Sequence, residues 1–290
     1  MSKILKALEK AGKEGALEVA VDRSPADPAA PADPAPVPGR PRRRHRTGVV
    51  VTQAPDPETL RGVDPHVVVL HKPMSVISEQ YRGMRSRVER ANADGRIQTL
   101  VITSAFKGEG KSVTATNLAA VFAQDPTKAV LLVDADLRRP RIHKLLGIEG
   151  TPGLGDLLRG RATLDEVLKT TPFYGLSVVT AGTVEGHPAE LLASPEFDDF
   201  IARARSQFDY IVLDTPPLHP ISDVNFLADA VDGIVLVVRA HKTHRGLVRQ
   251  AAEAIPKEKL LGTVLNRAES LRSGYGYGYG GAGYYYYKYY

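Results

Sequence analysis

The chain contains a series of short apolar runs, and helical patterns separate most of them. The runs are rich in Val, Ile and Leu: QTLVITS (98–104), AVLLVDAD (129–136), GLSVVTAG (175–182), YIVLDTPP (210–217), GIVLVVRA (233–240) and LLGTVLNR (260–267). Helical patterns occupy other segments: 75–91, 112–124, 142–146, 153–159, 163–169, 188–205, 222–228 and 243–254. Continuous apolar strands that alternate with helices are typical of a parallel sheet covered on both faces. The sequence therefore predicts an α/β fold with a doubly wound parallel sheet.

Composition divides the chain into four parts. Residues 1–15 are predicted to form a short basic amphipathic helix, because apolar positions share one stripe between lysines. Residues 16–70 are rich in Pro and Ala and then in Arg, so we expect a disordered linker that buries no core. Residues 71–270 carry the predicted sheet and its helices. Residues 271–290 are expected to form a flexible tail rich in tyrosine.

The net charge of +5 arises at one place in the sequence. The run RPRRRHR (40–46) holds five arginines, so the remainder of the chain is balanced. A basic surface for nucleic acid is therefore not expected. Two interpretations stay open for this run, a solvated linker or a contact with anionic lipid headgroups or an acidic partner. The helix predicted over 1–15 is likewise either solvated or docked on a partner or an anionic membrane.

Three absences narrow the classes of protein to which the chain could belong. The chain has no cysteine, which excludes disulfides and thiolate metal sites and fits a reducing compartment. No apolar run approaches the roughly 18 residues of a membrane span, and the beginning of the chain shows no signal-peptide pattern. We therefore expect a cytoplasmic location.

The segment AFKGEGKS (105–112) joins the first predicted strand to a helix and has the composition of a phosphate-binding loop. Ala105 stands where the G-x-x-x-x-G-K-[ST] pattern has its first glycine, a position that alanine fills when its φ is not left-handed. Glycines let backbone N–H groups turn toward a polyphosphate, a lysine reaches the β and γ phosphates, and a serine hydroxyl ligates Mg²⁺. The alternative is a Gly-rich turn beside a structural lysine. The predicted nucleotide-binding residues here are Lys107, Gly108, Glu109, Gly110, Lys111, Ser112 and Val113.

Carboxylates follow two of the predicted strands. Asp134 and Asp136 end the strand LLVDAD, and Asp214 ends IVLD. Because ligands bind outside the carboxyl ends of parallel strands, the three carboxylates should converge on the phosphate loop. Phosphoryl transfer needs a metal ion and a base that orients the attacking oxygen, and three carboxylates can supply both functions. A single Asp at such a position is more often a helix N-cap, an explanation that fits three of them poorly.

These motifs together resemble those of the bacterial tyrosine kinases, autokinases of polysaccharide export with an ATPase fold. The resemblance covers about residues 70–290: AFKGEGKS resembles the family's Walker A motif, LLVDADLRRP its Walker A′ and YIVLDTPP its Walker B. SEQYRGMRS and the tyrosine-rich tail also match the family. One departure is Lys107, which occupies the place of the family's usual proline. A lysine in this loop is typical of partition-type ATPases such as MinD and ParA, but there it lies one residue earlier, where this chain has Phe106.

The resemblance implies a role for each site residue. Lys111 and Ser112 would hold phosphates and Mg²⁺, and Asp136 and Asp214 would belong to the metal shell. Asp134 is the candidate base for the tyrosyl proton, although Asp134 and Asp136 can exchange roles. With an ordinary pKa of ~4, an Asp is a weak base toward a phenol whose pKa is ~10. We therefore expect its main contribution to be the orientation of the tyrosyl hydroxyl. Asn266 is interpreted either as an adenine contact or as a turn residue at a strand end.

Glu79, Arg82 and Arg85 have the family's E-x-x-R-x-x-R spacing on a predicted helix. The resemblance implies that they form an oligomer contact in a ring, which presents one subunit's tail to the next subunit's site. The alternative is a solvated helix face whose charges pair with one another.

Nine of the chain's twelve tyrosines lie in the tail GYGYGYGGAGYYYYKYY. Glycines prevent a persistent backbone shape, so a flexible tail can present several hydroxyls to one active site. The alternatives are a sticky low-complexity tail and a stacking platform for single-stranded nucleic acid, which the single lysine among the tyrosines makes a poor fit. The predicted phosphoacceptors are Tyr275, Tyr277, Tyr279, Tyr284, Tyr285, Tyr286, Tyr287, Tyr289 and Tyr290.

The resemblance thus implies an ATP- and Mg²⁺-dependent tyrosine autokinase that acts in trans and regulates exopolysaccharide or capsule synthesis and export. It also implies a membrane polysaccharide co-polymerase, or chain-length determinant, as activator, a cognate tyrosine phosphatase, and recruitment to the inner face of the membrane. The alternative functions are a MinD- or ParA-type positioning ATPase and a non-catalytic organiser that only binds ATP. Label from ATP on tail tyrosines would distinguish the kinase from both.

Overall fold

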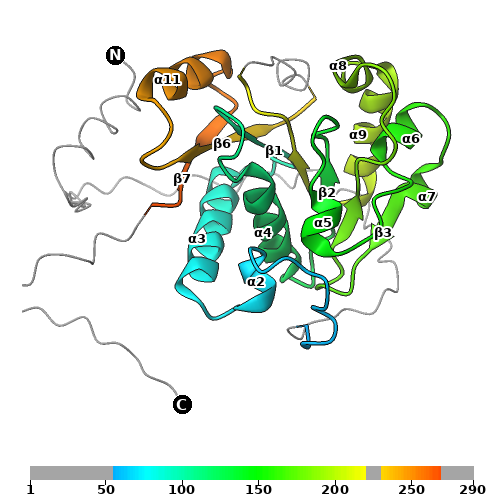
Figure 1. The fold of residues 1–290 in the computed structure, drawn as a ribbon, viewed down its shortest axis with the longest axis horizontal. Helices are drawn as coiled ribbons and strands as arrows, with labels where there is room; N and C mark the ends of the chain where they lie inside the picture. Colours follow the sequence, from blue (N-terminus) through cyan, green and yellow to red (C-terminus); the bar gives the residue numbers. More distant parts are fainter. Residues whose placement is uncertain (1–54, 220–229, 269–290) are drawn as a thin grey trace, which may run out of the picture. The chain divides into compact units, whose positions relative to one another are not determined.

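A seven-stranded sheet forms the centre of the computed structural model, which describes residues 55–219 and 230–268 (Figure 1). The strand order is β3-β4-β2-β5-β1-β6-β7. The strands are β1 (Thr99–Ser104), β2 (Val130–Asp134), β3 (Leu168–Thr170), β4 (Ser177–Val179), β5 (Tyr210–Asp214), β6 (Gly233–Arg239) and β7 (Leu260–Asn266). Neighbouring strands run parallel except for the edge pair β3 and β4. The predicted doubly wound α/β fold is confirmed.

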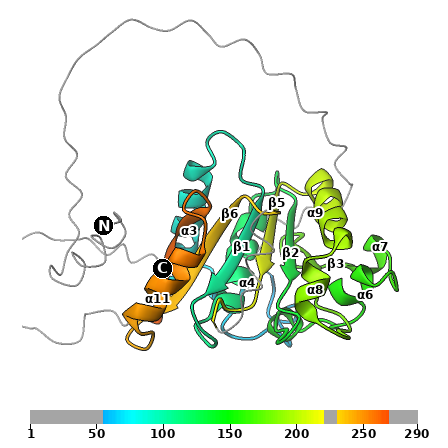
Figure 2. The ribbon, with the colours of Figure 1, turned by 90° about the horizontal axis from the view of Figure 1, so that it is seen from above.

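Helices cover both faces of the sheet, and the strands supply apolar side chains to each face in turn. In β1, Val101 packs in one layer while Leu100 and Ile102 pack in the other. The layer on the Leu100 side contains α2 (Val68–His71), α3 (Val76–Ala91), α4 (Lys111–Ala123) and α5 (Ile142–Leu146). The opposite layer contains α6 (Leu154–Leu158), α7 (Leu164–Val167), α8 (Pro188–Leu192), α9 (Pro195–Gln207) and α11 (Arg245–Ala254). Figure 2 shows the strands side by side between these helices.

Helix α4 is buried along almost its whole length, because the sheet, α3 and the segment before α3 enclose it. Residues 114–123 are all buried. Asn117 is a polar side chain within this apolar helix, and its oxygen accepts a hydrogen bond from the Val69 backbone N–H at 3.0 Å. Its nitrogen donates to the carbonyls of His66 at 2.9 Å and Val113 at 2.8 Å. Asn117 therefore connects the segment that contains α2 to α4 through hydrogen bonds.

The folded region begins earlier than the sequence suggested. Residues 55–70 were assigned to a disordered linker, but Val63, Val67, Val69 and Leu70 are buried in the layer over α4. This part of the linker prediction is wrong, because these apolar residues cover α4 and Asn117 bonds the backbone of His66 and Val69. Residues 1–15, residues 16–54 and the tail at 271–290 lie outside the described residues.

Two predicted helices differ in detail. The helix predicted over 163–169 ends at Val167, and Leu168–Thr170 then pair as the antiparallel edge strand β3. The helix predicted over 188–205 is interrupted between α8 and α9, where Ser194 is extended and Pro195 begins a new helix. The helix predicted over 222–228 lies outside the described residues.

Candidate active site

The phosphate loop (residues 105–110) connects β1 to α4, and two of its residues require glycine. Gly108 has φ of +79° and Gly110 has φ of +99°, in the left-handed region that side chains disfavour. A Cβ on Gly110 would also lie only 2.0 Å from Nδ2 of Asn266. Ala105 is buried and is not among the described residues with positive φ, so alanine is compatible with this first position.

Side chains from two other strand ends brace the phosphate loop. Glu109 is buried, and its Oε2 accepts a hydrogen bond from the Phe106 backbone N–H at 2.9 Å. Its Oε1 accepts a hydrogen bond from the Thr243 hydroxyl, which follows β6. Asn266 at the end of β7 donates from Nδ2 to the Glu109 carbonyl at 2.8 Å. Asn266 thus has a bracing role that neither sequence interpretation contained, and Thr243 was missed because only tertiary contact brings it to the loop.

Lys111 begins α4 and lies between two carboxylates. Its Nζ is 2.6 Å from Asp136 Oδ2 and 3.3 Å from Asp214 Oδ1, and all three side chains are buried. The Ser112 hydroxyl lies 3.3 Å from the same Nζ. The parallel register, which aligns Asp134 of β2 with Asp214 of β5, brings the strand ends together as expected. The structure therefore gathers the predicted lysine, serine and carboxylates in one place.

Asp134 and Asp136 also fix the loop that follows β2. Asp134 Oδ2 accepts hydrogen bonds from the backbone N–H groups of Arg141 and Ile142, both at 2.9 Å. Asp136 Oδ1 accepts one from the Arg139 N–H at 3.1 Å. Asp134 Oδ1 is buried without a hydrogen-bond partner in the described part of the chain. One oxygen of Asp134 therefore binds the loop, and the other makes no hydrogen bond to the described residues.

Burial and mutual repulsion change the acidity of this cluster. Burial, followed by the charge of Asp214, raises the pKa of Asp134 to about 8 against the opposing hydrogen bonds of the loop. Burial also raises the pKa of Asp214, against the opposing charge of Lys111. Burial acts to lower the pKa of Lys111, but Asp214 and Asp136 outweigh it and the pKa is raised. The expectation of an ordinary acidity for Asp134 was wrong, because sequence does not reveal how deeply a strand end is buried.

The donor set of this cluster fits a phosphorylated nucleotide with a divalent cation. Nothing lies within 4 Å of the Cβ position of Gly108, so the loop is open there, and Asp214 Oδ2 is a second buried oxygen without a partner in the described residues. Among those residues, no three His, Asp or Glu side chains are grouped so as to hold a metal alone. Mg²⁺ in phosphate-transfer sites characteristically takes one or two carboxylates together with phosphates and water. Ser112, Asp136 and Asp214 are the residues that would hold it.

The E-x-x-R-x-x-R residues lie on α3, where both arginines contact α4 of the same chain. Arg82 pairs with Glu79 and donates from Nε to Gln124 Oε1 at 3.4 Å. Arg85 donates to the Val121 carbonyl at 3.0 Å. Self-pairing is thus present, but the arginines are only about a quarter exposed, so the face is not simply solvated. Glu79 keeps more than half of its side chain exposed and available to another molecule.

The remaining predicted residues lie as follows. Lys107 and Phe106 are exposed on the phosphate loop, with the lysine Nζ 6.0 Å from the phenyl centroid. Val113 is half-buried against the layer over α4. The nine predicted phosphoacceptor tyrosines lie outside the described residues.

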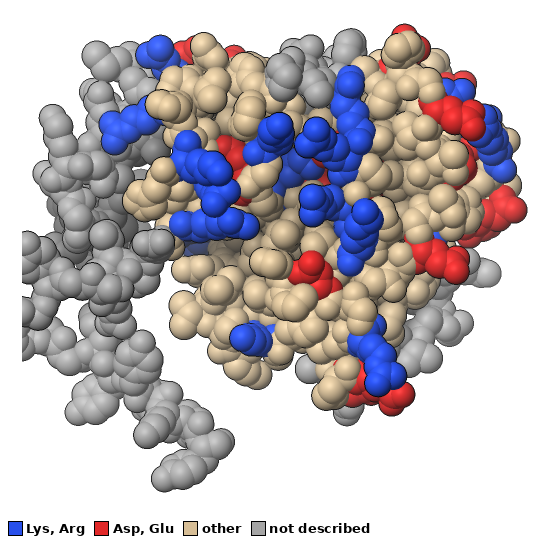
Figure 3. Space-filling model, in the orientation of Figure 1, with Lys and Arg blue, Asp and Glu red and all other residues tan. Residues whose placement is uncertain are grey.

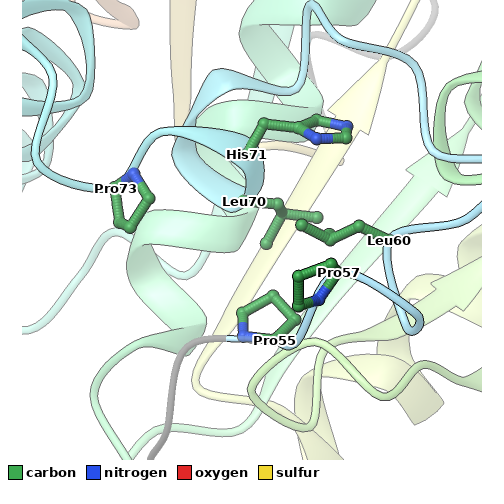
Figure 4. Close-up of a pocket in the computed structure, with 6 residues that line it drawn as sticks. All are labelled: Pro55, Pro57, Leu60, Leu70, His71 and Pro73. Atoms are coloured by element: carbon green, nitrogen blue, oxygen red, sulfur yellow. The ribbon is translucent and has the colours of Figure 1, made fainter.

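A separate cavity of about 360 Å³ lies beside α2, and none of the predicted site residues lines it (Figure 4). Its walls are mainly proline and leucine side chains from the segment before α3: Pro55, Pro57, Leu60, Leu70, His71 and Pro73. His71 is held by a hydrogen bond between Nε2 and the Val63 carbonyl at 3.1 Å. The cavity therefore belongs to the N-terminal segment and is distinct from the phosphate loop.

Comparison with known proteins decides the family. Residues 97–255 match the family model described as AAA domain. The tyrosine-protein kinase YwqD of Bacillus subtilis (strain 168) is 40% identical over 203 residues, which cover 69% of this chain and 85% of that protein. The chain belongs to the bacterial tyrosine kinase family. It is therefore a protein-tyrosine kinase built on a P-loop ATPase fold.

Solved structures agree with this assignment. The kinase superposes on the chimerical protein CapA2B2 with a TM-score of 0.67 at 33% identity, covering 71% of this chain and 91% of that chain. It superposes on the kinase domain of the Escherichia coli tyrosine kinase ETK with a TM-score of 0.65 at 29% identity, covering 73% and 84%. The matched length is thus most of the described part of the kinase. None of its described helices is long and apolar enough to cross a bilayer.

Proposed function

We propose that this kinase uses ATP and Mg²⁺ to phosphorylate tyrosines in its own C-terminal tail, in trans between subunits. The observation that carries the proposal is the cluster of Lys111 with Asp136 and Asp214 at the phosphate loop of a chain that ends in nine tyrosines. A buried lysine between carboxylates at the start of a helix is suited to phosphoryl transfer. The tail supplies tyrosyl hydroxyls as acceptors within the same chain, at high local concentration.

Each residue of the cluster has a defined part in this proposal. Bound Mg·ATP supplies the transferable phosphoryl group and a cation that offsets charge on its oxygens. Lys111 and the N–H groups of Gly108, Glu109, Gly110, Ser112 and Val113 bind phosphate oxygens, with Lys107 as a further positive charge. Ser112, Asp136 and Asp214 hold the cation. Asp134, in its ionised form, accepts the proton of the tyrosyl hydroxyl at Oδ1, the oxygen that does not bind the loop after β2.

Asn266 has a supporting part in the nucleotide site. Its hydrogen bond to the Glu109 carbonyl holds the end of β7 beside the phosphate loop. We therefore retain an adenine contact for Asn266 as part of the proposal. The bracing contact alone already explains why a short amide side chain is present there.

For transfer in trans we propose a ring-like homo-oligomer in which one subunit's tail reaches the next subunit's site. Glu79 is the exposed member of the α3 motif and is the proposed contact with a neighbouring subunit, while Arg82 and Arg85 hold α3 against α4 and its C-cap residue Gln124. A heterologous contact of this kind closes into a ring when the rotation between subunits permits it.

The resemblance to the bacterial tyrosine kinases of polysaccharide export supports a proposal for the cellular setting. We place the kinase in the cytoplasm, recruited to the inner face of the membrane by a polysaccharide co-polymerase of the chain-length-determinant type, which activates it. A cognate tyrosine phosphatase reverses the modification, and the cycle regulates polysaccharide synthesis and export. The basic segments 1–15 and 40–46 are candidates for an additional tether.

Labelled ATP and mapping of the label test the proposal. We expect label on tail tyrosines in the wild type and none in Lys111→Met, with unfolding midpoints measured for both proteins. Mixing Lys111→Met with a chain whose nine tail tyrosines are phenylalanine tests transfer in trans, because each is inactive or lacks acceptors when alone. Release of free phosphate with no labelled tyrosine would instead support a positioning ATPase, and neither product would support a non-catalytic organiser.

A further inference from the structure

Exposed basic side chains follow β2, directly beside the site carboxylates. The backbone N–H groups of Arg139 and Arg141 bind Asp136 and Asp134, so these two residues lie at the border of the site. Lys144 follows one turn later on α5, and all three side chains are exposed. Arg139, Arg141 and Lys144 are called the basic rim below. None of the three forms a salt bridge with another of the described residues.

Among residues 55–219 and 230–268, most acidic side chains near the rim are buried or have other partners. The carboxylates of the site are buried, and Lys111 already pairs with two of them. Asp64, which approaches α5 through its backbone, has its carboxylate bound to His66. Glu149 follows α5 and is the exposed acidic side chain nearest to the rim in sequence. Figure 3 shows Lys and Arg side chains gathered over the middle of one face, with Asp and Glu mostly toward one border.

The charge of the tail changes sign during the reaction. Residues 274–290 contain no acidic residue and one lysine, so an unmodified tail is neutral to slightly positive and has no electrostatic attraction to the rim. Each phosphate adds about −1.5 to −2 charges at neutral pH. Arginine guanidinium groups bind phosphate oxygens in a bidentate manner, and a lysine adds a point charge. The rim is therefore complementary to the product of the reaction and not to its substrate.

We propose that the basic rim binds phosphotyrosines of the tail, so that a tail that has received its first phosphate stays at the site for further transfers. The proposal rests on the proposed tail phosphorylation. Retention raises the local concentration of the remaining tyrosines, and nine closely spaced acceptors make several transfers within one encounter feasible. Multiply phosphorylated tails then accumulate before all tails have received one phosphate.

Binding of a synthetic tail peptide to the full-length kinase tests the rim without requiring the kinase's own activity. The kinase is first treated with a tyrosine phosphatase and then saturated with Mg·ADP, so that the phosphate loop is occupied. Fluorescence anisotropy compares an unmodified peptide of residues 273–290 with one phosphorylated at Tyr284, Tyr286 and Tyr289. We expect roughly tenfold tighter binding of the phosphopeptide, weakening as salt is raised.

The decisive variant neutralises the rim by replacing Arg139, Arg141 and Lys144 with Gln, and we expect it to lose that roughly tenfold preference. The matched control replaces three exposed basic residues elsewhere: Arg61, Arg87 and Lys257. It makes the same change in net charge, and we expect wild-type binding. Equal losses in both variants would show a general charge effect and overturn the proposal.

The binding experiment also separates the phosphopeptide from two other ligands, the nucleotide and an anionic membrane. Loss of phosphopeptide binding on saturation with Mg·ADP would show that only the nucleotide site binds phosphate, which would also overturn the proposal. The proposal would also be overturned if the rim variant lost binding to phosphatidylserine vesicles but kept its affinity for the phosphopeptide.

The distribution of phosphates gives a second readout in the active enzyme. Mass spectrometry at low total incorporation should show multiply phosphorylated beside unmodified tails in the wild type, and mainly singly phosphorylated tails in the rim variant. This ratio does not depend on the overall rate. If tails are labelled but the distributions coincide, retention fails while the kinase assignment stands. If no tail is labelled, the proposed function itself fails.

Discussion

Replacing Gly110 by alanine tests how the phosphate loop is held. The expected loss of unfolding free energy is the sum of two separate contributions. Alanine at φ of +99° costs about 1–2 kcal/mol in backbone strain. The added Cβ would lie 2.0 Å from Asn266 Nδ2, so the Asn266 side chain must move and lose its hydrogen bond to the Glu109 carbonyl. That loss costs about 1 kcal/mol. We expect Gly110→Ala to be destabilised by about 2–3 kcal/mol, or about 4–12 °C in Tm for a domain of this size.

A double-mutant cycle separates the two contributions. Asn266→Ala alone removes the hydrogen bond, so in that background Gly110→Ala should cost only the backbone strain, and the cycle should show about 1 kcal/mol of coupling. Gly160 is the matched control, because it has φ of +66° but nothing within 4 Å of its Cβ position. Gly160→Ala should therefore cost strain alone and show no coupling to Asn266.

The assay is urea unfolding of the four proteins of each cycle, followed by circular dichroism. Additive costs for Gly110→Ala and Asn266→Ala would refute the bracing contact, because they would mean that the alanine does not displace the amide. Coupling between Gly160 and Asn266 of similar size would show that the effect is not local. Tail labelling measured in parallel reports whether the strained loop still transfers phosphate.

Three further predictions concern buried polar groups. Relative to the wild type, Asp134→Asn should gain about 1.4 kcal/mol of unfolding free energy per pH unit as pH rises from about 4 to 8. The reason is that Asp134 loses its proton above its ordinary pKa of 3.8 in the unfolded chain but keeps it up to about pH 8 in the folded chain. Melting in EDTA across this range checks it, and a pH-independent difference would contradict it. Lys111→Met should abolish tail labelling and lose about 3–5 kcal/mol of unfolding free energy, because Asp136 and Asp214 lose their buried cation; an unchanged urea midpoint would contradict a stabilising role of these ion pairs. Asn117→Ala should cost about 2–3 kcal/mol and expose the segment around α2 to limited proteolysis, because the Val69 N–H is left without its partner; wild-type protection would show that apolar packing alone holds the segment.

Much of the site was predictable because its residues are contiguous in motifs that follow strands. The positions of Lys111, Ser112, Asp134, Asp136 and Asp214 follow from apolar strands that run parallel and end at one edge. The edge strand β3 was not predictable, because Leu168–Thr170 are only three half-exposed residues whose conformation depends on pairing with β4. The early start of the domain was missed because residues 55–70 follow a proline-rich stretch and contain little regular structure.

The sequence alone determined the fold class, the phosphate loop and its carboxylates, because strand periodicity and motif spacing are local properties of the chain. It also supplied the tyrosine tail, whose chemistry is a matter of composition. Only the tertiary structure decided how these parts act on one another. Contacts between residues far apart in sequence place Asn266 and Thr243 against the loop, draw Lys111 between two buried carboxylates, and raise the pKa of Asp134. The strengths of these contacts and the pKa of Asp134 depend on burial and on the distances between groups. Neither is defined until the strands have come together in the folded chain.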